Sequence, residues 1–432
     1  MKIENLLGKK IGIFGYGVEG RSLVDYLRSK AINNIAVFDE KKSVEIDGVK
    51  FIHKDFDQLE EADIGGLEVV FRSPGIKRER LAAVLPPSVK ITSLINLFLA
   101  NCRGKVIGIT GTKGKSTTAR LVGSILEEAG KKVFIGGNIG NSALDFLDQT
   151  TEDGFSILEL SSFQLEDAEY SPDTALILPV IIDHLDYHKD LDEYLEAKSG
   201  IVKNMRDDDL IVCAKQSNAQ IIAERSSARK IYYSDKTDFT ELKSFSDEYK
   251  IPFIDIAAAF SLACALEINV KPADAFKDFI KPKFRIELAG EVNSVSYFND
   301  SASTNPISTI AAIEIMNDDF ALALGGSEKN LDYGPLAQKM KESSKLVRVY
   351  LFGKTGPRIA DKLKKVGFDR PMVEKDNISE IFQDSLLNHE DFKVFLFSPA
   401  SASFDQFKNY VERGEFFNNL VKNEISQEKN PA

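Results

Sequence analysis

Short apolar runs, rich in β-branched and aromatic residues, alternate with helical segments along almost the whole chain. This alternation is typical of parallel β-sheets whose strands are joined by crossover helices. The 432 residues are enough for about three domains of roughly 150 residues each. We therefore predict an α/β protein of three domains, 1–95, 96–285 and 286–432.

Each predicted domain has its own group of strands. The polar stretch at 234–250 is predicted to be a surface loop, and residues 423–432 are predicted to fray. The expected strands are 10–15, 34–39, 49–53 and 67–73 in the first domain; 105–110, 132–137, 155–160, 174–180 and 209–214 in the second; and 295–300, 320–326, 347–353 and 393–399 in the third.

Composition and charge narrow the class of protein. Hydrophobic residues make up 43% of the chain and charged residues 28%, as in an ordinary globular protein. The net charge of -11, with no basic block, argues against nucleic-acid binding. No apolar run reaches the ~18 residues of a membrane span, and no signal-peptide core opens the sequence. Cys102, Cys213 and Cys264 fit neither a disulfide framework nor a metal knuckle. We expect a cytoplasmic protein.

A first glycine motif, "GYGVEG" at Gly15–Gly20, follows a predicted strand and opens a predicted helix. Asp39 ends the next strand, about twenty residues further on. In dinucleotide-binding folds such glycines let the backbone approach a pyrophosphate, and the carboxylate reaches ribose hydroxyls. The motif predicts a nucleotide-type ligand, although a tight strand-to-helix corner without a ligand is the alternative.

A second glycine motif, "GITGTKGKSTT", begins at Gly108. It lies between a strand and a helix like a phosphate-binding loop, but Ile109 stands where the common spacing requires glycine. Lys115 would reach the outer phosphates, and Ser116 or Thr117 would bind Mg²⁺. A helix N-terminus contributes only about 0.3–1 kcal/mol to anion binding, so the lysine and the metal must supply most of the stabilisation. A glycine turn with a solvated lysine is the alternative.

Two further segments carry groups that could bind metal. Glu159 ends an apolar strand, where α/β sheets keep their ligands. In "DHLDYHKDLDEYLEAK", His184 and His188 have the spacing of a zinc helix. The flanking carboxylates favour instead either Mg²⁺ surroundings or a solvated loop; they are Asp183, Asp186 and Asp190.

The third predicted domain places three polar loops after successive strands. They are "YFNDSASTNP", "LGGSEKNLD" and "FSPASASFDQFKNYVERGEFF". Each loop alone is ordinary turn or helix-cap chemistry. The carboxyl ends of parallel strands meet at one crevice, so three such loops together predict a binding site there.

Taken in order, these motifs resemble those of the Mur ligases of peptidoglycan synthesis. The resemblance spans nearly the whole chain and is greatest to the ligases that add D-glutamate to UDP-N-acetylmuramoyl-L-alanine. Its further segments are "SPGI", "GGNIG", "LELSSFQLE", "YLEAK" and "FRIE". The phosphate loop of this family reads Gly-x-x-Gly-Thr-x-Gly-Lys-Ser/Thr, which Gly108, Gly111 and Gly114 match.

The resemblance implies a fold and a reaction. It implies an N-terminal Rossmann-like domain for the UDP-sugar, a central P-loop ATPase domain with a mainly parallel sheet, and a C-terminal Rossmann-like domain for the amino acid. ATP and two Mg²⁺ ions would drive amide formation between UDP-N-acetylmuramoyl-L-alanine and D-glutamate through an acyl phosphate. The enzyme would act as a monomer with small-molecule substrates only.

The resemblance also implies roles for individual residues. Lys115, Glu159, His184 and Lys198 would be catalytic, and Lys198 would be carbamylated; Ser116, Glu159, His184 and Lys198 would surround the metals. ATP would contact Gly111, Thr112, Lys113, Gly114, Lys115, Ser116, Thr117, Arg285 and Asp300. The UDP-sugar would contact Gly15, Tyr16, Gly17, Val18, Glu19, Gly20, Asp39, Ser73 and Asn138, and the amino acid would contact Thr304, Lys329, Ser403 and Tyr410.

The chain departs from the family pattern at four places. Ala302 replaces a lysine, Phe284 replaces a histidine, and Lys113 stands where Asn or Asp is common. The His-Asn pair expected to contact adenine is absent from the start of the helix at 254–266. A lost charge-assisted hydrogen bond costs about 1.5–3 kcal/mol, so amino-acid and adenine recognition are the parts that the resemblance leaves open.

Four alternatives therefore remain at this point. The enzyme could use another amino acid, or it could be a folate-type amide ligase, although such ligases begin at the ATPase domain. It could be a non-catalytic UDP-sugar binder, which the joint retention of five residues disfavours: Lys115, Ser116, Glu159, His184 and Lys198. An NAD oxidoreductase would leave the second glycine loop unexplained.

Overall fold

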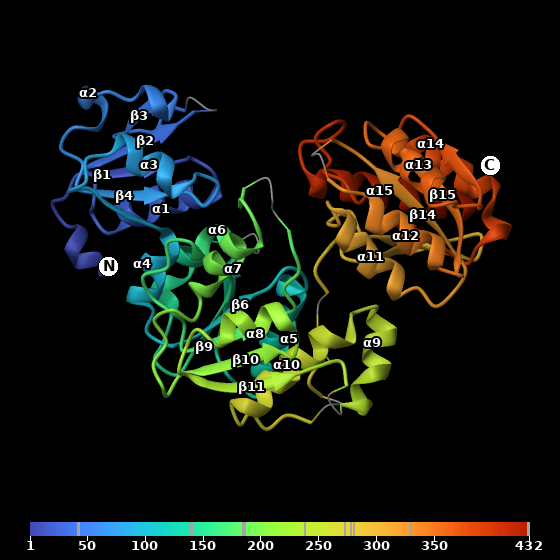
Figure 1. Cartoon of the computed structure of the whole chain (residues 1–432), viewed down its shortest axis with the longest axis horizontal. Coiled ribbons are helices and arrows are strands. Elements are labelled where there is room, and N and C mark those ends of the chain that lie inside the picture. Colours follow the sequence, from blue (N-terminus) through green and yellow to red (C-terminus); the bar gives the residue numbers. More distant parts are fainter. Residues whose placement is uncertain are drawn as a thin grey trace. The chain divides into compact units, whose positions relative to one another are not determined.

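The computed structural model shows three α/β parts, each built around its own β-sheet, coloured blue, green and orange in Figure 1. It describes residues 1–40, 44–138, 142–183, 187–236, 239–271, 274–276, 279, 281–328 and 331–429. Within these residues, no helix is both long enough and apolar enough to span a membrane.

The first sheet is parallel and has the strand order β3-β2-β1-β4-β5. Phe14 of β1 stacks on Phe38 of β2, with ring centroids 4.3 Å apart. The elements of this part are η1 (Ile3–Leu6), β1 (Ile11–Phe14), α1 (Val18–Ser29), β2 (Ile35–Asp39), β3 (Lys50–His53), η2 (Phe56–Gln58), α2 (Glu61–Ile64), β4 (Val69–Arg72), α3 (Arg78–Val84), β5 (Lys90–Thr92) and α4 (Leu94–Asn101).

The second sheet is also parallel and has the order β11-β10-β9-β6-β8-β7. Its central strand β6 pairs with β8 on one side and β9 on the other, so the chain leaves β6 toward one edge and later crosses to the other. The elements are β6 (Lys105–Thr110), α5 (Lys115–Glu128), β7 (Val133–Gly137), η3 (Ala143–Asp145), η4 (Leu147–Gln149), β8 (Phe155–Glu159), α6 (Ser162–Leu165), β9 (Thr174–Ile177), α7 (Leu191–Ser199), β10 (Leu210–Ala214), α8 (Ser217–Ala223), β11 (Arg229–Tyr233) and α10 (Phe253–Ala265).

The third sheet has the order β12-β13-β17-β14-β15-β16, and only the β12–β13 pair is antiparallel. The elements are α9 (Lys243–Tyr249), β12 (Glu287–Val292), β13 (Val295–Asn299), α11 (Pro306–Glu314), β14 (Phe320–Gly325), α12 (Gly334–Glu342), β15 (Leu346–Phe352), α13 (Gly356–Lys365), β16 (Met372–Glu374), α14 (Ile378–Leu387), η6 (His389–Asp391), β17 (Val394–Phe397) and α15 (Tyr410–Lys429). The short helix η5 (Thr240–Leu242), directly before α9, still belongs to the compact unit that contains the first two sheets.

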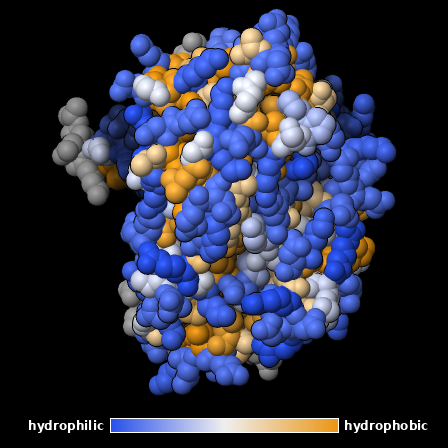
Figure 2. All heavy atoms as spheres, turned by 90° about the vertical axis from the view of Figure 1, so that its left-hand side faces the viewer, coloured by the Kyte–Doolittle hydropathy of each residue, from blue (hydrophilic) through white to orange (hydrophobic). Residues whose placement is uncertain are grey.

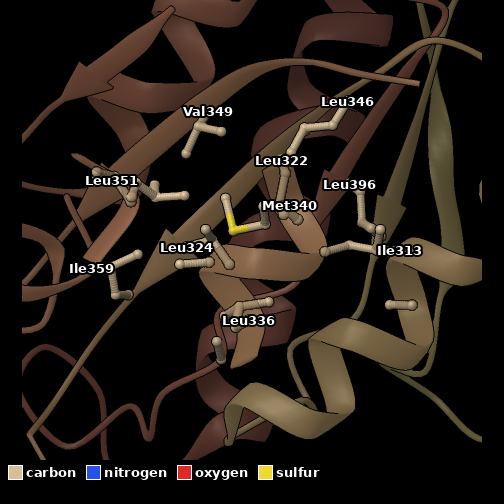
Figure 3. Close-up of a cluster of buried hydrophobic side chains, with 14 of the residues drawn as sticks. Ile313, Leu322, Leu324, Leu336, Met340, Leu346, Val349, Leu351, Ile359 and Leu396 are labelled. Carbon is tan, nitrogen blue, oxygen red and sulfur yellow. The ribbon is translucent and has the colours of Figure 1, made fainter. Parts of the chain in front are cut away.

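Helices cover both faces of the third sheet. Leu322 and Leu324 of β14 pack with Leu336 and Met340 of α12 on one face, which Figure 3 shows. Ala321 and Ala323 of the same strand face the aromatic cluster formed with α14 and α15. Because both faces are covered, β14 is buried throughout and reads as a continuous apolar run.

The chain divides into two compact units. Residues 1–243 and 253–279 form the first, which contains the first two sheets; residues 244–252 and 280–432 form the second. The segment 244–252 therefore groups with the C-terminal part, although residues 253–279 of the first unit lie between them in sequence. The boundaries near 95 and 285 stay predictions.

Two local predictions are wrong. Residues 240–249 are η5 and α9 rather than a surface loop, because Lys281 donates hydrogen bonds to the carbonyls of Tyr249 and Lys250 at the end of α9. Residues 423–429 continue α15 instead of fraying, and Ile425 packs onto the aromatic core. Neither contact is local in sequence.

The face of the molecule in Figure 2 is mostly hydrophilic, with hydrophobic residues in separate areas among the polar ones. This agrees with the charged content of 28%. Apolar residues exposed singly or in small groups are ordinary on a folded surface.

Candidate functional site

The loop between β6 and α5 depends on two glycines with unusual backbone conformations. Gly111 has φ +147° and Gly114, which precedes α5, has φ +81°. A Cβ at position 111 would lie 2.6 Å from Leu178 Cβ, and one at position 114 would collide with the Asp255 carboxylate. Because L side chains rarely take these conformations, the sequence needs glycine at both positions. The motif is thus a genuine cradle at the end of the central strand.

Two lysine side chains converge on this loop. Lys115 donates from Nζ to the carbonyls of Gly111 and Thr112 at 3.2 and 3.0 Å, and Lys198 donates to the Gly111 carbonyl at 2.9 Å. Lys198 is only 2% exposed. Burial lowers the pKa of Lys198 well below its usual value, the charge on Lys115 lowers it further, and the carboxylates of Asp183 and Glu159 oppose the shift. A buried amine with weakened proton affinity lies beside the glycine cradle.

Oxygen-bearing side chains lie at the next strand end. Ser116, in the first turn of α5, donates from Oγ to Glu159 Oε2 at 2.5 Å, and Asn138 donates from Nδ2 to Glu159 Oε1 at 3.0 Å. Strand pairing sets this arrangement, since Ile109 of β6 lies beside Glu159 of β8. Glu159, Ser116, Asn138, Lys115 and Lys198 are therefore brought together.

Tyr194 is a loop partner that the sequence did not indicate. It is buried in α7, and its hydroxyl lies 3.2 Å from Thr112 Oγ1. Its ring lies under Lys198, one helical turn later, with Nζ 4.7 Å from the centroid. The i,i+4 spacing of Tyr and Lys in "YLEAK" was the available signal.

The histidine-containing segment proves partly structural. His188 is buried, stacks on Phe163 and lies 2.9 Å from Ser162 Oγ, so this residue is not part of a solvated loop. Asp190 caps α7 by accepting a hydrogen bond from the Glu193 amide. His184 and Asp186 lie outside the described residues, within which no cluster of three or more His, Cys, Asp or Glu side chains is arranged to hold a metal ion.

A cavity of about 410 Å³ opens beside the glycine cradle. Its wall includes Pro179, whose carbonyl accepts a hydrogen bond from the Thr112 amide at 3.1 Å. Phe253 and Ile254 line it at the start of α10, where the His-Asn pair is absent. The amide of Gln216, also in its wall, bonds to the backbone of Val180 and Ala219.

The first glycine motif also forms a cradle, at the end of β1, which we call the first glycine cradle. Gly15 has φ +91°, and a Cβ there would lie 2.7 Å from Ser73 Oγ. Ser73 donates from that oxygen to the Gly15 carbonyl at 3.0 Å, and the Tyr16 amide donates to Asp39 Oδ2 at 2.7 Å. Gly17 precedes α1, which contains Val18, Glu19 and Gly20. The predicted sugar-nucleotide residues of this part thus gather at the carboxyl ends of β1, β2 and β4.

Glu19 reaches from this cradle to the central part. Its Oε1 accepts a hydrogen bond from Gln164 Nε2 at 2.6 Å. Burial raises the pKa of Glu19 to about 7, although the hydrogen bond from Gln164 and the charge of Arg72 act in the opposite direction.

The second compact unit holds the remaining predicted residues. Asp300 is buried and accepts a hydrogen bond from Ser398 Oγ at 2.7 Å. Arg285 lies between Phe284 and Ile286, whose φ values are +59° and +49°. Such conformations are rare for side chains of this kind and often mark functional segments.

The loops predicted to bind the amino acid follow β13, β14 and β17. Ser403 is buried, Thr304 is half-buried and Tyr410 is exposed at the start of α15, while Lys329 lies outside the described residues. A missed residue, Arg413, is fully buried and donates to the carbonyls of Ser301, Ser401 and Ala402. This buried cation ties two of the three loops together.

The comparisons with known proteins cover nearly the whole chain. A model of the Mur ligase middle domain matches residues 109–271. UDP-N-acetylmuramoylalanine–D-glutamate ligase of Clostridium tetani is 30% identical over 449 residues, which cover 97% of each chain. The chain belongs to the Mur ligase family. The ligase of the same name from Clostridium novyi is 31% identical, over 96% of this chain and 97% of the relative.

Solved structures of Mur ligases share the fold. UDP-N-acetylmuramate–alanine ligase from Thermotoga maritima has a TM-score of 0.58 at 16% identity, covering 98% of this chain and 100% of its own. MurF ligase from Thermotoga maritima, in complex with ADP, has a TM-score of 0.59 at 16% identity, covering 99% and 98%.

For this Mur ligase the predicted family and fold class are confirmed. The roles predicted for its individual site residues stay predictions.

Proposed function

We propose that this chain is an ATP-dependent ligase that joins D-glutamate to UDP-N-acetylmuramoyl-L-alanine in peptidoglycan synthesis. One observation carries the proposal: Lys115 and Lys198 meet at the Gly111 carbonyl, beside Glu159 and Ser116. The reaction brings a carboxylate to a triphosphate, and clustered cationic groups counter that repulsion. The names of relatives that are about 30% identical support the same reaction.

ATP would enter the glycine cradle between β6 and α5. Lys115 would exchange its two backbone carbonyl partners for phosphate oxygens, because a charged acceptor binds an ammonium group more strongly than a neutral one. The adenine would occupy the cavity bounded by Pro179, Phe253 and Ile254. Apolar contacts there would replace the hydrogen bonds of the absent His-Asn pair. Lys113 and Thr117 complete the loop, and ATP contacts for Arg285 and Asp300 are proposed from the family pattern alone.

The oxygen donors near the cradle fit Mg²⁺. Ser116 Oγ and the Glu159 carboxylate are 2.5 Å apart and are hard ligands of the kind this ion prefers. Bound there, Mg²⁺ would neutralise phosphate charge. We propose two ions, one held by Ser116 and the second by Glu159 and His184. The Lys198 amine is not a ligand of this kind, and carbamylation would turn it into an anion beside the metals.

The sugar nucleotide would bind at the first glycine cradle. Gly15–Gly20, Asp39 and Ser73 surround the carboxyl end of β1, and Asn138 extends from β7 to Glu159. The carboxylate of UDP-N-acetylmuramoyl-L-alanine would attack the γ-phosphorus of ATP, forming an acyl phosphate and releasing ADP. The amine of D-glutamate would then form the C–N bond as the C–O bond to phosphate breaks and one proton leaves.

The identity of the amino acid rests on the second unit. Thr304, Lys329, Ser403 and Tyr410 would surround it, as the family pattern implies. Ala302 offers no charge, and its amide donates to the Phe284 carbonyl at 3.0 Å. This substitution favours a second candidate function, the same ligation with a different amino acid.

The remaining parts of the proposal concern location and assembly. We propose a cytoplasmic monomer. The three cysteines are all free thiols, which is usual in a reducing compartment.

Phosphate release tests the function. We expect ADP and phosphate only when ATP, Mg²⁺, UDP-N-acetylmuramoyl-L-alanine and an amino acid are all present, with D-glutamate the best of a panel of amino acids. Lys115→Ala should lower turnover by about 10²–10³-fold, because it removes the main cation from the developing charge. Binding of the sugar nucleotide, measured by calorimetry, should be unchanged.

Lys131→Ala, an exposed lysine beyond the far end of α5, is the matched control and should keep full turnover. Turnover with folate and L-glutamate instead, or sugar-nucleotide binding without turnover for every amino acid, would refute the proposal. Full activity of Lys115→Ala would remove its central observation.

A further inference from the structure

Arg72 is a buried arginine at the end of an otherwise apolar strand. It is the last residue of β4, directly before the Ser73 loop, and is only 1% exposed. A buried guanidinium is costly unless nearly all of its donors find acceptors. Its surroundings therefore reveal what the strand end is built to hold.

On the N-terminal side, Arg72 holds the loop that follows it. Its Nη1 donates to the carbonyls of Pro74, at 3.3 Å, and Ile76. The same loop carries Ser73, which donates to the Gly15 carbonyl at 3.0 Å. Arg72 thus holds the Ser73 loop directly, and Ser73 in turn connects that loop to the Gly15 loop.

On the central side, Arg72 holds the segment that follows β8. It donates from Nε to Asp167 and from Nη2 to the Phe163 carbonyl at 2.9 Å, and lies 3.3 Å from Glu166. This segment begins with α6, which only two residues separate from Glu159 at the end of β8. Arg72 therefore connects the sugar-nucleotide loops to the strand end that carries Glu159.

Neighbouring contacts make this connection continuous. Arg78 also binds Asp167, at 2.9 Å, and Asn96 Nδ2 donates to the Asp167 carbonyl at 2.7 Å. Glu19 accepts its hydrogen bond from Gln164 in the same region. We call Arg72, Asn96, Glu19 and residues 163–167 the buried seam; Arg78 contacts it from the exposed side. It lies wholly within the first compact unit.

We propose that Arg72 is a positioning residue for the ligation: its guanidinium sets where the sugar-nucleotide loops stand relative to Glu159 and the phosphate loop. The proposal rests on the proposed function. A planar guanidinium can serve acceptors on both sides of the seam at once, whereas a lysine ammonium is a compact point charge. Small displacements of reacting groups have large effects, since about 1 Å can cost 10²-fold in rate.

A purely structural role is the competing explanation, because loss of one partner from a buried ion pair also destabilises a protein. Three variants separate the two. Arg72→Met removes the charge and the fork, Arg72→Lys keeps the charge alone, and Arg78→Ala removes the more exposed partner of Asp167 without touching the Pro74 and Ile76 carbonyls. Kinetics are measured well below each variant's melting temperature.

For Arg72→Lys and Arg72→Met we expect KM for UDP-N-acetylmuramoyl-L-alanine to rise about tenfold and kcat to fall by up to about 10²-fold. The Kd for an ATP analogue should stay within twofold of wild type. Arg72→Lys should recover part of the melting temperature but not the kinetic loss. Arg78→Ala should keep both kinetic constants.

Unchanged KM and kcat in a destabilised but folded Arg72→Met would overturn the proposal, as would recovery of the kinetic constants in Arg72→Lys. If both position-72 variants fail to fold, Asp167→Asn supplies the same test from the other side of the ion pair. Direct calorimetry of sugar-nucleotide binding, together with turnover, distinguishes failure of the positioning proposal from failure of the proposed function. A wild-type enzyme without turnover would refute the proposed function. Equal sugar-nucleotide affinity and equal turnover in wild type and variants would refute the positioning role alone.

Discussion

Glu19 is a carboxyl group that packing has removed from water inside the first glycine cradle. Burial raises its pKa to about 7, from 4.5 in an exposed chain. The folded protein keeps this proton up to about pH 7, while the unfolded chain releases it near 4.5. The stability that protonation contributes is therefore complete below pH 4.5 and is lost as the pH rises through about 7.

Glu19→Gln should consequently stabilise the protein above pH 7, because it supplies a neutral acceptor for Gln164 permanently. The gain at pH 8 should be at most about 3 kcal/mol, at about 1.4 kcal/mol for each pKa unit, and should vanish near pH 5. Thermal unfolding between pH 5 and 8 measures it. Glu152→Gln, at an exposed glutamate, is the control; an equal gain at both pH values would contradict the assignment.

Much of the residue-level chemistry could be read from spacing, but its surroundings could not. Gly111, Gly114, Lys115 and Ser116 are fixed by a local strand-loop-helix pattern, and the structure brings them to one cradle. The burial of Lys198 and the convergence of its amine on Gly111 depend on α7 packing against a loop 87 residues away in sequence. Only tertiary contacts create that environment.

Among the elements, α15 packs closely against Phe284, in the segment before β12. Gly414 lies in the second turn of α15, and a Cβ there would be 2.7 Å from Phe284 Cγ. Phe284 is buried and stands where the resemblance predicts histidine. The glycine leaves room for the Phe284 ring, although the two residues are 130 positions apart in sequence.

Gly414→Ala should therefore destabilise the protein by about 1–3 kcal/mol through overpacking, although Ala favours a helix over Gly by about 1 kcal/mol. Chemical denaturation measures the change. Phe284→Leu in the same chain should recover most of the loss. A Cβ in Gly123→Ala, in α5, would lie 2.7 Å from the flexible tip of Ile135 and at ordinary contact distance from Ile157, so this change should cost less. A stabilised Gly414→Ala would show that the ring moves away freely.

At the scale of the whole molecule, the first two sheets belong to one compact unit. The buried seam joins them, and a second group of contacts reinforces it: Ser22 of α1 donates a hydrogen bond to Asp145, and Lys30, directly after α1, binds Asp148 at 2.6 Å. Interfaces with buried ion pairs are expected to separate only when the unit as a whole opens.

Hydrogen exchange along a denaturant series tests this cooperativity. Amides of β4 in the first sheet and of β8 in the second should lose protection at the same denaturant concentration, whereas β14 in the other unit serves as an independent reference. Earlier loss of protection in β4 than in β8 would mean that the first sheet unfolds alone, and would contradict a single unit.

By itself, the sequence determined the alternation of strands and helices, the two glycine cradles and membership of the Mur ligase family, because each is written in short patterns that fold locally. Only the tertiary structure decided that residues 243–249 form a helix, that His188 is a core residue and that Arg72 joins two sheets. Their conformations depend on burial and on partners distant in sequence, which no local pattern specifies.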